Sequence, residues 1–395
     1  MNSLAIRILT GFITFMVGVA VATALVFNHK SPQIAPVNLS NNDRTLEMVF
    51  VLDTTGSMGG LIDGAKQRIW GIVNEVMQSS SHPAVKIGLV AYRDRGDEYV
   101  TQVLPLTEDL DKVYMTLMNY NAAGGGDTAE DVRRALADGV AKAGWSESGQ
   151  NVARIIFLVG DAPPHDDYAN EQDTIVTAAL ARERGMIVNT IQCGTAADTK
   201  QAWQTIAQYG RGQYFAIPQN GGVETIATPF DGKISQLGAK LGGTYLAYGG
   251  GAGEAGVVYR EEAKKRADVS EASVAASAPA EAQVQRSFNK AINAKAYIGD
   301  LLQDIENGSV QIASLKQEDL PSDLKDLSVA DRTKEIERRL AERREIRKQI
   351  LELSKQRADY IAAEQKKRTG VTKNSFDLAV SAALKEQMAG AFRIE

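Results

Sequence analysis

From residue 46 to residue 248, apolar stretches alternate with stretches whose apolar residues recur every three or four positions. LEMVFVLD at 46–53 is almost continuously apolar, as expected of a strand buried on both faces of a parallel sheet. Strands alternating with helices predict an α/β fold with a doubly wound, mostly parallel sheet and helices on both faces. Because a proline cannot donate a ladder hydrogen bond, Pro105 indicates that the strand expected at 98–106 lies at an edge of the sheet. Strands are expected at 46–53, 85–94, 98–106, 153–161, 186–194 and 212–217, and helices at 60–78, 109–119, 129–144, 171–185, 200–210 and 223–243.

The beginning of the chain has a different character. Residues 8–27 carry no charge and are long enough to cross ~30 Å of hydrocarbon as a helix. We expect residues 1–30 to be a signal anchor, with a transmembrane helix that leaves the rest in the periplasm or outside the cell. The alternative is a signal peptide cleaved near Ala24, followed by secretion. Residues 31–45 are polar and are interpreted as a spacer to a domain at 46–248.

After residue 248 the pattern breaks. Residues 249–282 hold a glycine run and then an Ala/Ser-rich stretch, which predicts a linker. The remainder, 283–395, is expected to be an α-helical C-terminal region. Its helix at 330–368 has 13 basic and 8 acidic residues between 331 and 368, a net charge of +5. We expect this helix to form a hairpin packed on 284–305. Self-association as a coiled coil, contact with anionic lipid, and a merely solvated charged face remain open.

Composition limits the chemistry. The net charge of −5 and pI near 5.5 argue against a nucleic-acid partner. A single cysteine, Cys193, excludes an internal disulfide framework, and three histidines leave little for a histidine-based metal site. Any metal is therefore expected to have oxygen ligands.

Oxygen-bearing side chains occur in three loops. Two of these loops follow predicted strands, and the third precedes a predicted helix. Asp53, Thr55 and Ser57 alternate directly after the first strand. Thr128 lies in the glycine-rich segment GGGDTAE, and Asp161 ends the strand ARIIFLVGD. Ligand sites in open α/β sheets lie at the carboxyl ends of the strands, and hard divalent cations prefer such oxygens. The five residues together therefore predict a metal site.

This pattern resembles the metal-ion-dependent adhesion site of von Willebrand factor type A domains, over about residues 44–248. GGGDTAE and FLVGDAPPH are similar to forms in bacterial, membrane-anchored members, with Ala129 where proline is common. The resemblance implies a Rossmann-like fold and Mg²⁺, or alternatively Mn²⁺ or Ca²⁺, held by Asp53, Thr55, Ser57, Thr128 and Asp161. It also implies a protein-binding module rather than an enzyme, in which an acidic side chain of a protein partner completes the metal shell.

Two other functions remain open. Ser57 and His165 could serve a hydrolase, although DTTGS lacks the G-x-S-x-G arrangement around a nucleophilic serine. Related A-type domains also act as chelatase or chaperone subunits beside an ATPase, a role that the apolar N-terminus argues against.

Overall fold

A computed structural model describes residues 44–79, 83–126, 129–147, 149, 151–367 and 375–392. Residues 41–395 form one compact unit. The membrane segment predicted at 8–27 lies outside the described residues. Within them, no helix combines the length and the apolar character needed to span a bilayer.

The described chain contains a six-stranded sheet in the order β3-β2-β1-β4-β5-β6. All neighbouring strands are parallel except β3, which pairs antiparallel with β2 at one edge. The predictions of a mostly parallel sheet and of an edge strand containing Pro105 are thus confirmed. The strands are β1 (Thr45–Asp53), β2 (Ala84–Tyr92), β3 (Thr101–Thr107), β4 (Val152–Gly160), β5 (Met186–Cys193) and β6 (Arg211–Ile217).

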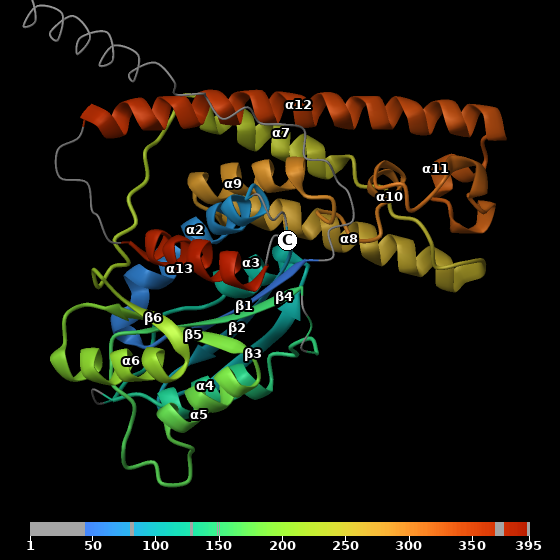
Figure 1. Ribbon diagram of the computed structural model, residues 1–395. Coiled ribbons are helices and arrows are strands. Elements are labelled where there is room, and N and C mark those ends of the chain that lie inside the picture. Colours follow the sequence, from blue (N-terminus) through green and yellow to red (C-terminus); the bar gives the residue numbers. More distant parts are fainter. Residues whose placement is uncertain are drawn as a thin grey trace, which may run out of the picture. The chain divides into compact units, whose positions relative to one another are not determined.

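Helices cover both faces of this sheet (Figure 1). Because side chains alternate along a strand, Met48 and Phe50 face α2 (Gly59–Met77), α3 (Leu110–Met118) and α13 (Phe376–Ala391). Val49 and Val51 point the opposite way, into a second core. That core is completed by α4 (Val132–Ala141), α5 (Thr174–Glu183) and α6 (Ala197–Tyr209).

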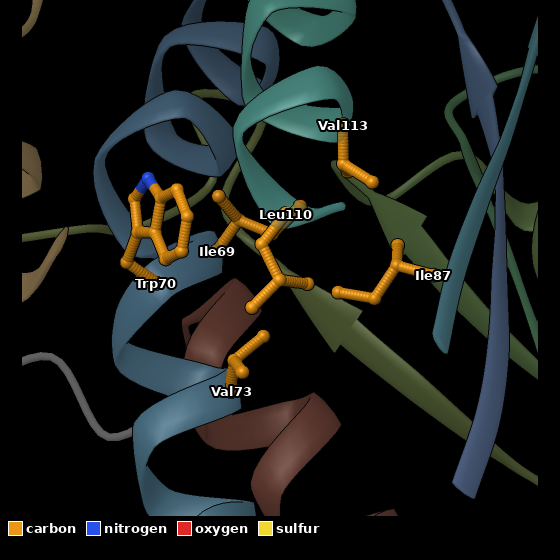
Figure 2. A pocket seen from close by; sticks show the side chains of 6 residues that line it. All are labelled: Ile69, Trp70, Val73, Ile87, Leu110 and Val113. Carbon is orange, nitrogen blue, oxygen red and sulfur yellow. The ribbon is translucent and has the colours of Figure 1, made fainter. Parts of the chain in front are cut away.

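A void of about 10 Å³ lies in the first core, where α2 and α3 meet β2 (Figure 2). Ile69, Leu110 and Ile87 are among its apolar lining residues. It is about the volume of a single water probe, so it is a packing defect rather than a ligand cavity.

Helices also make up most of the chain between residues 231 and 367. They are α7 (Asp231–Gly243), α8 (Gly253–Ser277), α9 (Ala280–Ile292), α10 (Leu301–Glu306), α11 (Ser322–Lys325) and α12 (Val329–Lys367), with 3₁₀ turns at Ile312–Ser314 and Gln317–Asp319.

Two of these helices differ from the sequence-based expectation. Helix α7 begins only at Asp231, whose carboxylate accepts hydrogen bonds from the backbone N–H and hydroxyl of Thr228. Helix α8 occupies most of 249–282, where a linker is predicted. Alanine and charged residues are good helix formers. Tertiary contacts also hold this helix, since Arg260 donates to the Gly249 and Glu318 carbonyls.

Helix α12 runs along α7 as well as α9 (Figure 1). Because α7 lies outside 284–305, the packing predicted on that range is only part of the interface of α12. Its apolar residues Ile336, Leu340, Ile346 and Ile350 are buried within the chain. The apolar face that a coiled coil would need is therefore already covered by the chain's own helices.

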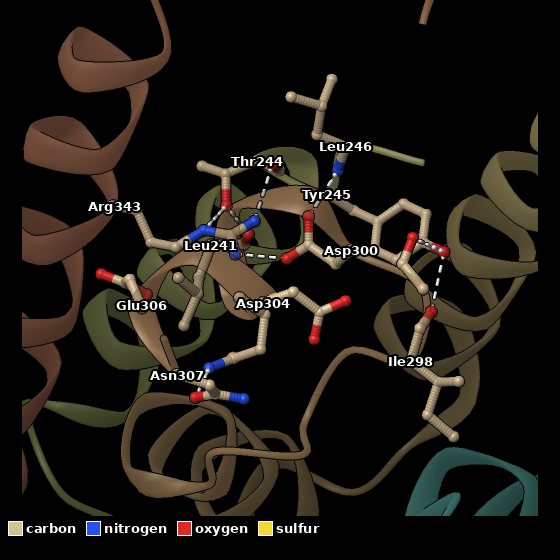
Figure 3. A network of polar contacts seen from close by, with 12 residues as sticks. Leu241, Thr244, Tyr245, Leu246, Ile298, Asp300, Asp304, Glu306, Asn307 and Arg343 are labelled. Atoms are coloured by element: carbon tan, nitrogen blue, oxygen red, sulfur yellow. Dashed lines mark hydrogen bonds and ion pairs between the residues drawn. The ribbon is translucent and has the colours of Figure 1, made fainter. Parts of the chain in front are cut away.

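The basic side chains of α12 are divided between its two faces. Arg343 is fully buried and pairs with the fully buried Asp300 (Figure 3). Arg357 is also buried and pairs with Asp231 and Glu281. Two of the 13 basic residues counted in the sequence thus neutralise acids inside the molecule.

The last helix belongs to the core of the sheet rather than to a separate helical layer. Phe376 of α13 lies 6.0 Å from Phe50 of β1 between ring centroids. The Gln387 amide exchanges two buried hydrogen bonds with Asn189 of β5, at 2.7 and 3.0 Å. The sequence predicts a domain at 46–248 and a helical region at 283–395, but in the folded chain α13 returns to cover the sheet.

Candidate functional site

The carboxyl end of β1 places Asp53 and Thr55 in a buried turn. Asp53 is 0% exposed, and its Oδ1 accepts hydrogen bonds from the Thr55 N–H at 2.8 Å and the Thr55 hydroxyl at 2.6 Å. Asp53 Oδ2 has no hydrogen-bond partner within the described residues. A Cβ on Gly160 would collide with the Tyr92 hydroxyl and lie 3.1 Å from this oxygen, so the close packing of Tyr92 and Asp53 requires glycine here. One carboxylate oxygen is therefore held in place while the other is left for another partner.

The glycine-rich loop after α3 lies directly against this turn. The Gly56 N–H donates to the Gly124 carbonyl, and the Ala123 N–H donates to the Thr54 carbonyl. Gly124 and Gly125 both have positive φ, where a side chain would be strained. The predicted ligand Thr128 lies outside the described residues. The described part of its loop nevertheless approaches the β1 turn as the sequence predicts.

Asp161 follows β4, the neighbour of β1 in the sheet. Its charge contributes to the raised pKa of Asp53, as expected for acids gathered at one sheet edge. Its Oδ2 accepts a 2.5 Å hydrogen bond from the side-chain amide of Gln219. Asp161 is partly exposed, in contrast to Asp53.

Ser57 is exposed in the 3₁₀ turn Gly56–Met58 that precedes α2. Its main-chain carbonyl lies 3.5 Å from the Gln219 amide nitrogen. Asp53, Thr55, Ser57 and Asp161 therefore all belong to the loops at the ends of β1 and β4.

Glu130 is a further member of the site that is not among the predicted ligands. It is buried, and its Oε2 has no hydrogen-bond partner in the described parts of the chain. Burial raises the pKa of Glu130 to about 9, and the charges of Asp53, Asp94 and Asp161 add to the effect. Burial likewise raises the pKa of Asp53 to about 7. The sequence shows Glu130 as the last residue of GGGDTAE, but it does not show that this side chain is buried.

His165 lies in the loop after β4, among acidic and aromatic neighbours. Its Nδ1 is 2.8 Å from Asp167 Oδ1, its Nε2 is 3.5 Å from Asp94 Oδ2, and its ring stacks on Tyr168. Asp94, which follows β2, also accepts a hydrogen bond from the Tyr168 hydroxyl. His165 thus joins the β2 and β4 loops at the rim of the site.

The donor chemistry of this edge suits a hard divalent cation. Carboxylate and hydroxyl oxygens are the ligands that Mg²⁺ and Ca²⁺ prefer, and Asp53 Oδ2, which no described residue hydrogen-bonds, points to one ligand position. No group of three or more His, Cys, Asp and Glu side chains has metal-binding geometry in the part of the chain that the structure describes. A cation here would therefore depend on hydroxyls and water as well as on carboxylates.

Comparison with known proteins agrees with this fold. Residues 47–228 match the family model of the von Willebrand factor A domain. The chain contains a von Willebrand factor A domain. Such domains typically serve protein interaction or adhesion. A search of curated proteins found no match.

Two solved structures illustrate the likeness. The VWA domain of SpRpn10 has 16% identity and a TM-score of 0.33, with 45% of this chain and 88% of that one covered. The pilus adhesin SpaC from Lactobacillus rhamnosus GG has 13% identity and a TM-score of 0.35, with 45% of this chain and 28% of that one covered.

Proposed function

We propose that this von Willebrand factor A domain is a metal-dependent protein-binding module and not an enzyme. Asp53, Thr55, Ser57, Thr128 and Asp161 would hold Mg²⁺, or alternatively Mn²⁺ or Ca²⁺, and an acidic side chain of the partner would complete the shell. The proposal includes the setting predicted from sequence, with residues 8–27 in a membrane and the domain in the periplasm or outside the cell.

The observation that carries the proposal is the arrangement of the Asp53 carboxylate. One oxygen is fixed by two donors of Thr55, and the other is buried without a hydrogen-bond partner among the described residues. A buried acceptor left unmatched costs about 1–3 kcal/mol, and a charged one costs more. A bound cation would remove this cost.

The residues of the chain then have separate roles. Thr55 orients the Asp53 carboxylate, Asp161 supplies a second acid from the neighbouring strand end, and Ser57 offers an exposed hydroxyl. When bound, the cation supplies a positive charge that attracts a carboxylate. Only two of the five proposed ligands are carboxylates, and the cation would keep a ligand position for the carboxylate of the partner.

The first test is isothermal titration of the full-length chain with Mg²⁺. Asp53→Asn retains shape and removes the charge, so we expect Mg²⁺ binding to be lost while the circular dichroism spectrum is unchanged. Asp268→Asn is the matched control, because Asp268 is a half-exposed residue of α8. Equal Mg²⁺ affinity in wild type and Asp53→Asn would refute the metal site.

The second test concerns the partner. Wild-type protein and the Asp268→Asn control should capture a partner from envelope extract in Mg²⁺ and release it in EDTA. The Asp53→Asn protein should capture none. Capture that survives both EDTA and the Asp53 substitution would contradict metal-dependent binding.

A further inference from the structure

Gln219 reaches the candidate cation site from a strand that supplies none of the proposed ligands. It lies just after β6, and its side-chain amide donates to Asp161 Oδ2 at 2.5 Å. The same nitrogen lies 3.5 Å from the main-chain carbonyl of Ser57. A single amide group therefore contacts both the β1 and the β4 loop.

The surrounding chain leaves room for this side chain and fixes its loop. Gly194 has a φ of +84°, and a Cβ there would collide with Gln219 Oε1. A Cβ on Gly60 would approach the backbone of Asn220 to 2.9 Å, so α2 packs closely against this loop. The Phe376 N–H donates to the Gly221 carbonyl at 3.0 Å. These contacts come from the residue after β5, from α2 and from α13, so the loop that carries Gln219 is held on several sides.

The two proposed acidic ligands differ in how they are held. Asp53 is fully buried and is oriented by Thr55 from its own turn. Asp161 is partly exposed, and its described side-chain hydrogen bond comes from Gln219. The bond is exposed to solvent, and without it the Asp161 side chain would have more freedom to rotate.

A hydrogen bond to one oxygen of a ligating carboxylate directs the other oxygen and reduces the freedom lost on binding. Such outer contacts are worth about tenfold to a hundredfold in metal affinity. A neutral amide is suited to this role, because it donates to the carboxylate without adding a positive charge that would repel the cation.

We infer that Gln219 is a positioning residue of the cation site: its amide clamps Asp161 and joins the β1, β4 and β6 loops. The inference rests on the proposed metal site. The hydrogen bond from Gln219 favours Mg²⁺ over Ca²⁺, because Mg²⁺ requires near-octahedral ligands whereas Ca²⁺ accepts flexible and varied ones. Gln219 therefore contributes to selectivity as well as to affinity.

The experiment compares Gln219→Leu with Gln213→Leu in the full-length chain. Gln213 is a matched control, since it is a β6 glutamine whose amide donates to a carboxylate, that of Glu386 on α13. Mg²⁺ and Ca²⁺ affinities are measured separately by isothermal titration. Thermal unfolding in EDTA verifies that both variants are folded.

For Gln219→Leu we expect Mg²⁺ affinity to fall by about tenfold or more, with a smaller loss for Ca²⁺, while Gln213→Leu behaves as wild type. Equal losses for the two ions would overturn the positioning role in favour of a general structural one. Unchanged Mg²⁺ affinity in Gln219→Leu, with binding still lost in Asp53→Asn, would overturn this inference alone. If the wild-type chain binds neither ion, the proposed function and the inference both fail.

Discussion

The buried pair between Arg343 and Asp300 provides a demanding test of how the C-terminal helices are held. Both side chains are 0% exposed. The Arg343 guanidinium also donates to the hydroxyl and the carbonyl of Thr244, at 2.8 and 2.7 Å. Asp300 accepts a 2.8 Å hydrogen bond from the Leu246 N–H (Figure 3). α12 is thus joined to the segments that follow α7 and precede α10.

Substituting Arg343→Met removes the guanidinium charge and the three nitrogens that donate hydrogen bonds, while the methionine side chain fills most of the volume that the arginine occupied. Asp300 would remain buried with only backbone donors, and breaking a buried pair in this way costs about 3–5 kcal/mol. With a urea m-value near or above ~3 kcal/mol/M for a unit of this size, the unfolding midpoint should fall by about 1 M. Burial already raises the pKa of Asp300 and Arg343 opposes the rise, so the variant should raise that pKa further.

The control is Arg338→Met on the same helix. Arg338 is 59% exposed and pairs with Glu335 and Glu342 in solvent, so its loss should leave the free energy of unfolding almost unchanged. Adding Asp300→Asn to Arg343→Met should recover part of the loss, because the unpaired charge is then gone.

Urea unfolding is followed by circular dichroism, which reports all helices, and by tryptophan fluorescence. The tryptophans are Trp70, Trp145 and Trp203, all outside the C-terminal helices. Coincident shifts in both signals would mean that the sheet and these helices unfold together. If Arg343→Met is no more destabilised than Arg338→Met, the reasoning from the buried pair is refuted.

Two further predictions concern contacts between the sheet's helices and the C-terminal part of the chain. Burial alone would raise the pKa of Asp111, but the positive charges of Arg286 and Lys290 on α9 outweigh this effect, so the pKa is lowered. The stabilisation from the ionised Asp111 is therefore complete above the unfolded pKa of 3.8. It is lost progressively as the pH falls toward the lowered pKa of the folded state. Asp111→Asn should therefore cost about 2 kcal/mol at pH 7 and somewhat less at pH 3 in urea unfolding, because the lowered pKa keeps the folded carboxylate ionised at that pH; a cost that rises on acidification would contradict this. Phe376→Ala should cost about 3–5 kcal/mol in the same assay, because a large buried ring is removed from the core. The half-exposed Leu378, changed to Ala, should cost far less, and equal costs would show that α13 is not part of the core.

Local patterns in the sequence are enough to predict the elements of the sheet and the strand ends that carry the acidic side chains. Strands such as 153–160 are apolar on both faces, so they had to lie in the interior of a parallel sheet covered on both sides. Asp53 and Asp161 each follow such a strand, and parallel strands bring their carboxyl ends to one edge. These predictions need only local periodicity and the direction of the chain.

Long-range packing decided what the sequence left open. The Ala/Ser-rich segment has a composition compatible with linker or helix, and contacts such as Arg260 with the Gly249 carbonyl favoured α8. Helix α13 is amphipathic in sequence, but only the folded chain shows that its partner is the distant sheet, where Gln387 meets Asn189. No local pattern encodes a partner almost 200 residues away.

The charges illustrate the same division. Counting residues in 331–368 gives a net charge of +5, but it cannot show that Arg343 and Arg357 point inward to buried acids.

Around the candidate site, the sequence predicts Asp53, Thr55, Ser57, Thr128 and Asp161, while the fold adds the buried Glu130 and the amide of Gln219. Residue type and strand order along the chain predict which oxygens can meet. Burial and hydrogen-bond partners, which set their charge and orientation, exist only once the strands, loops and helices are packed together.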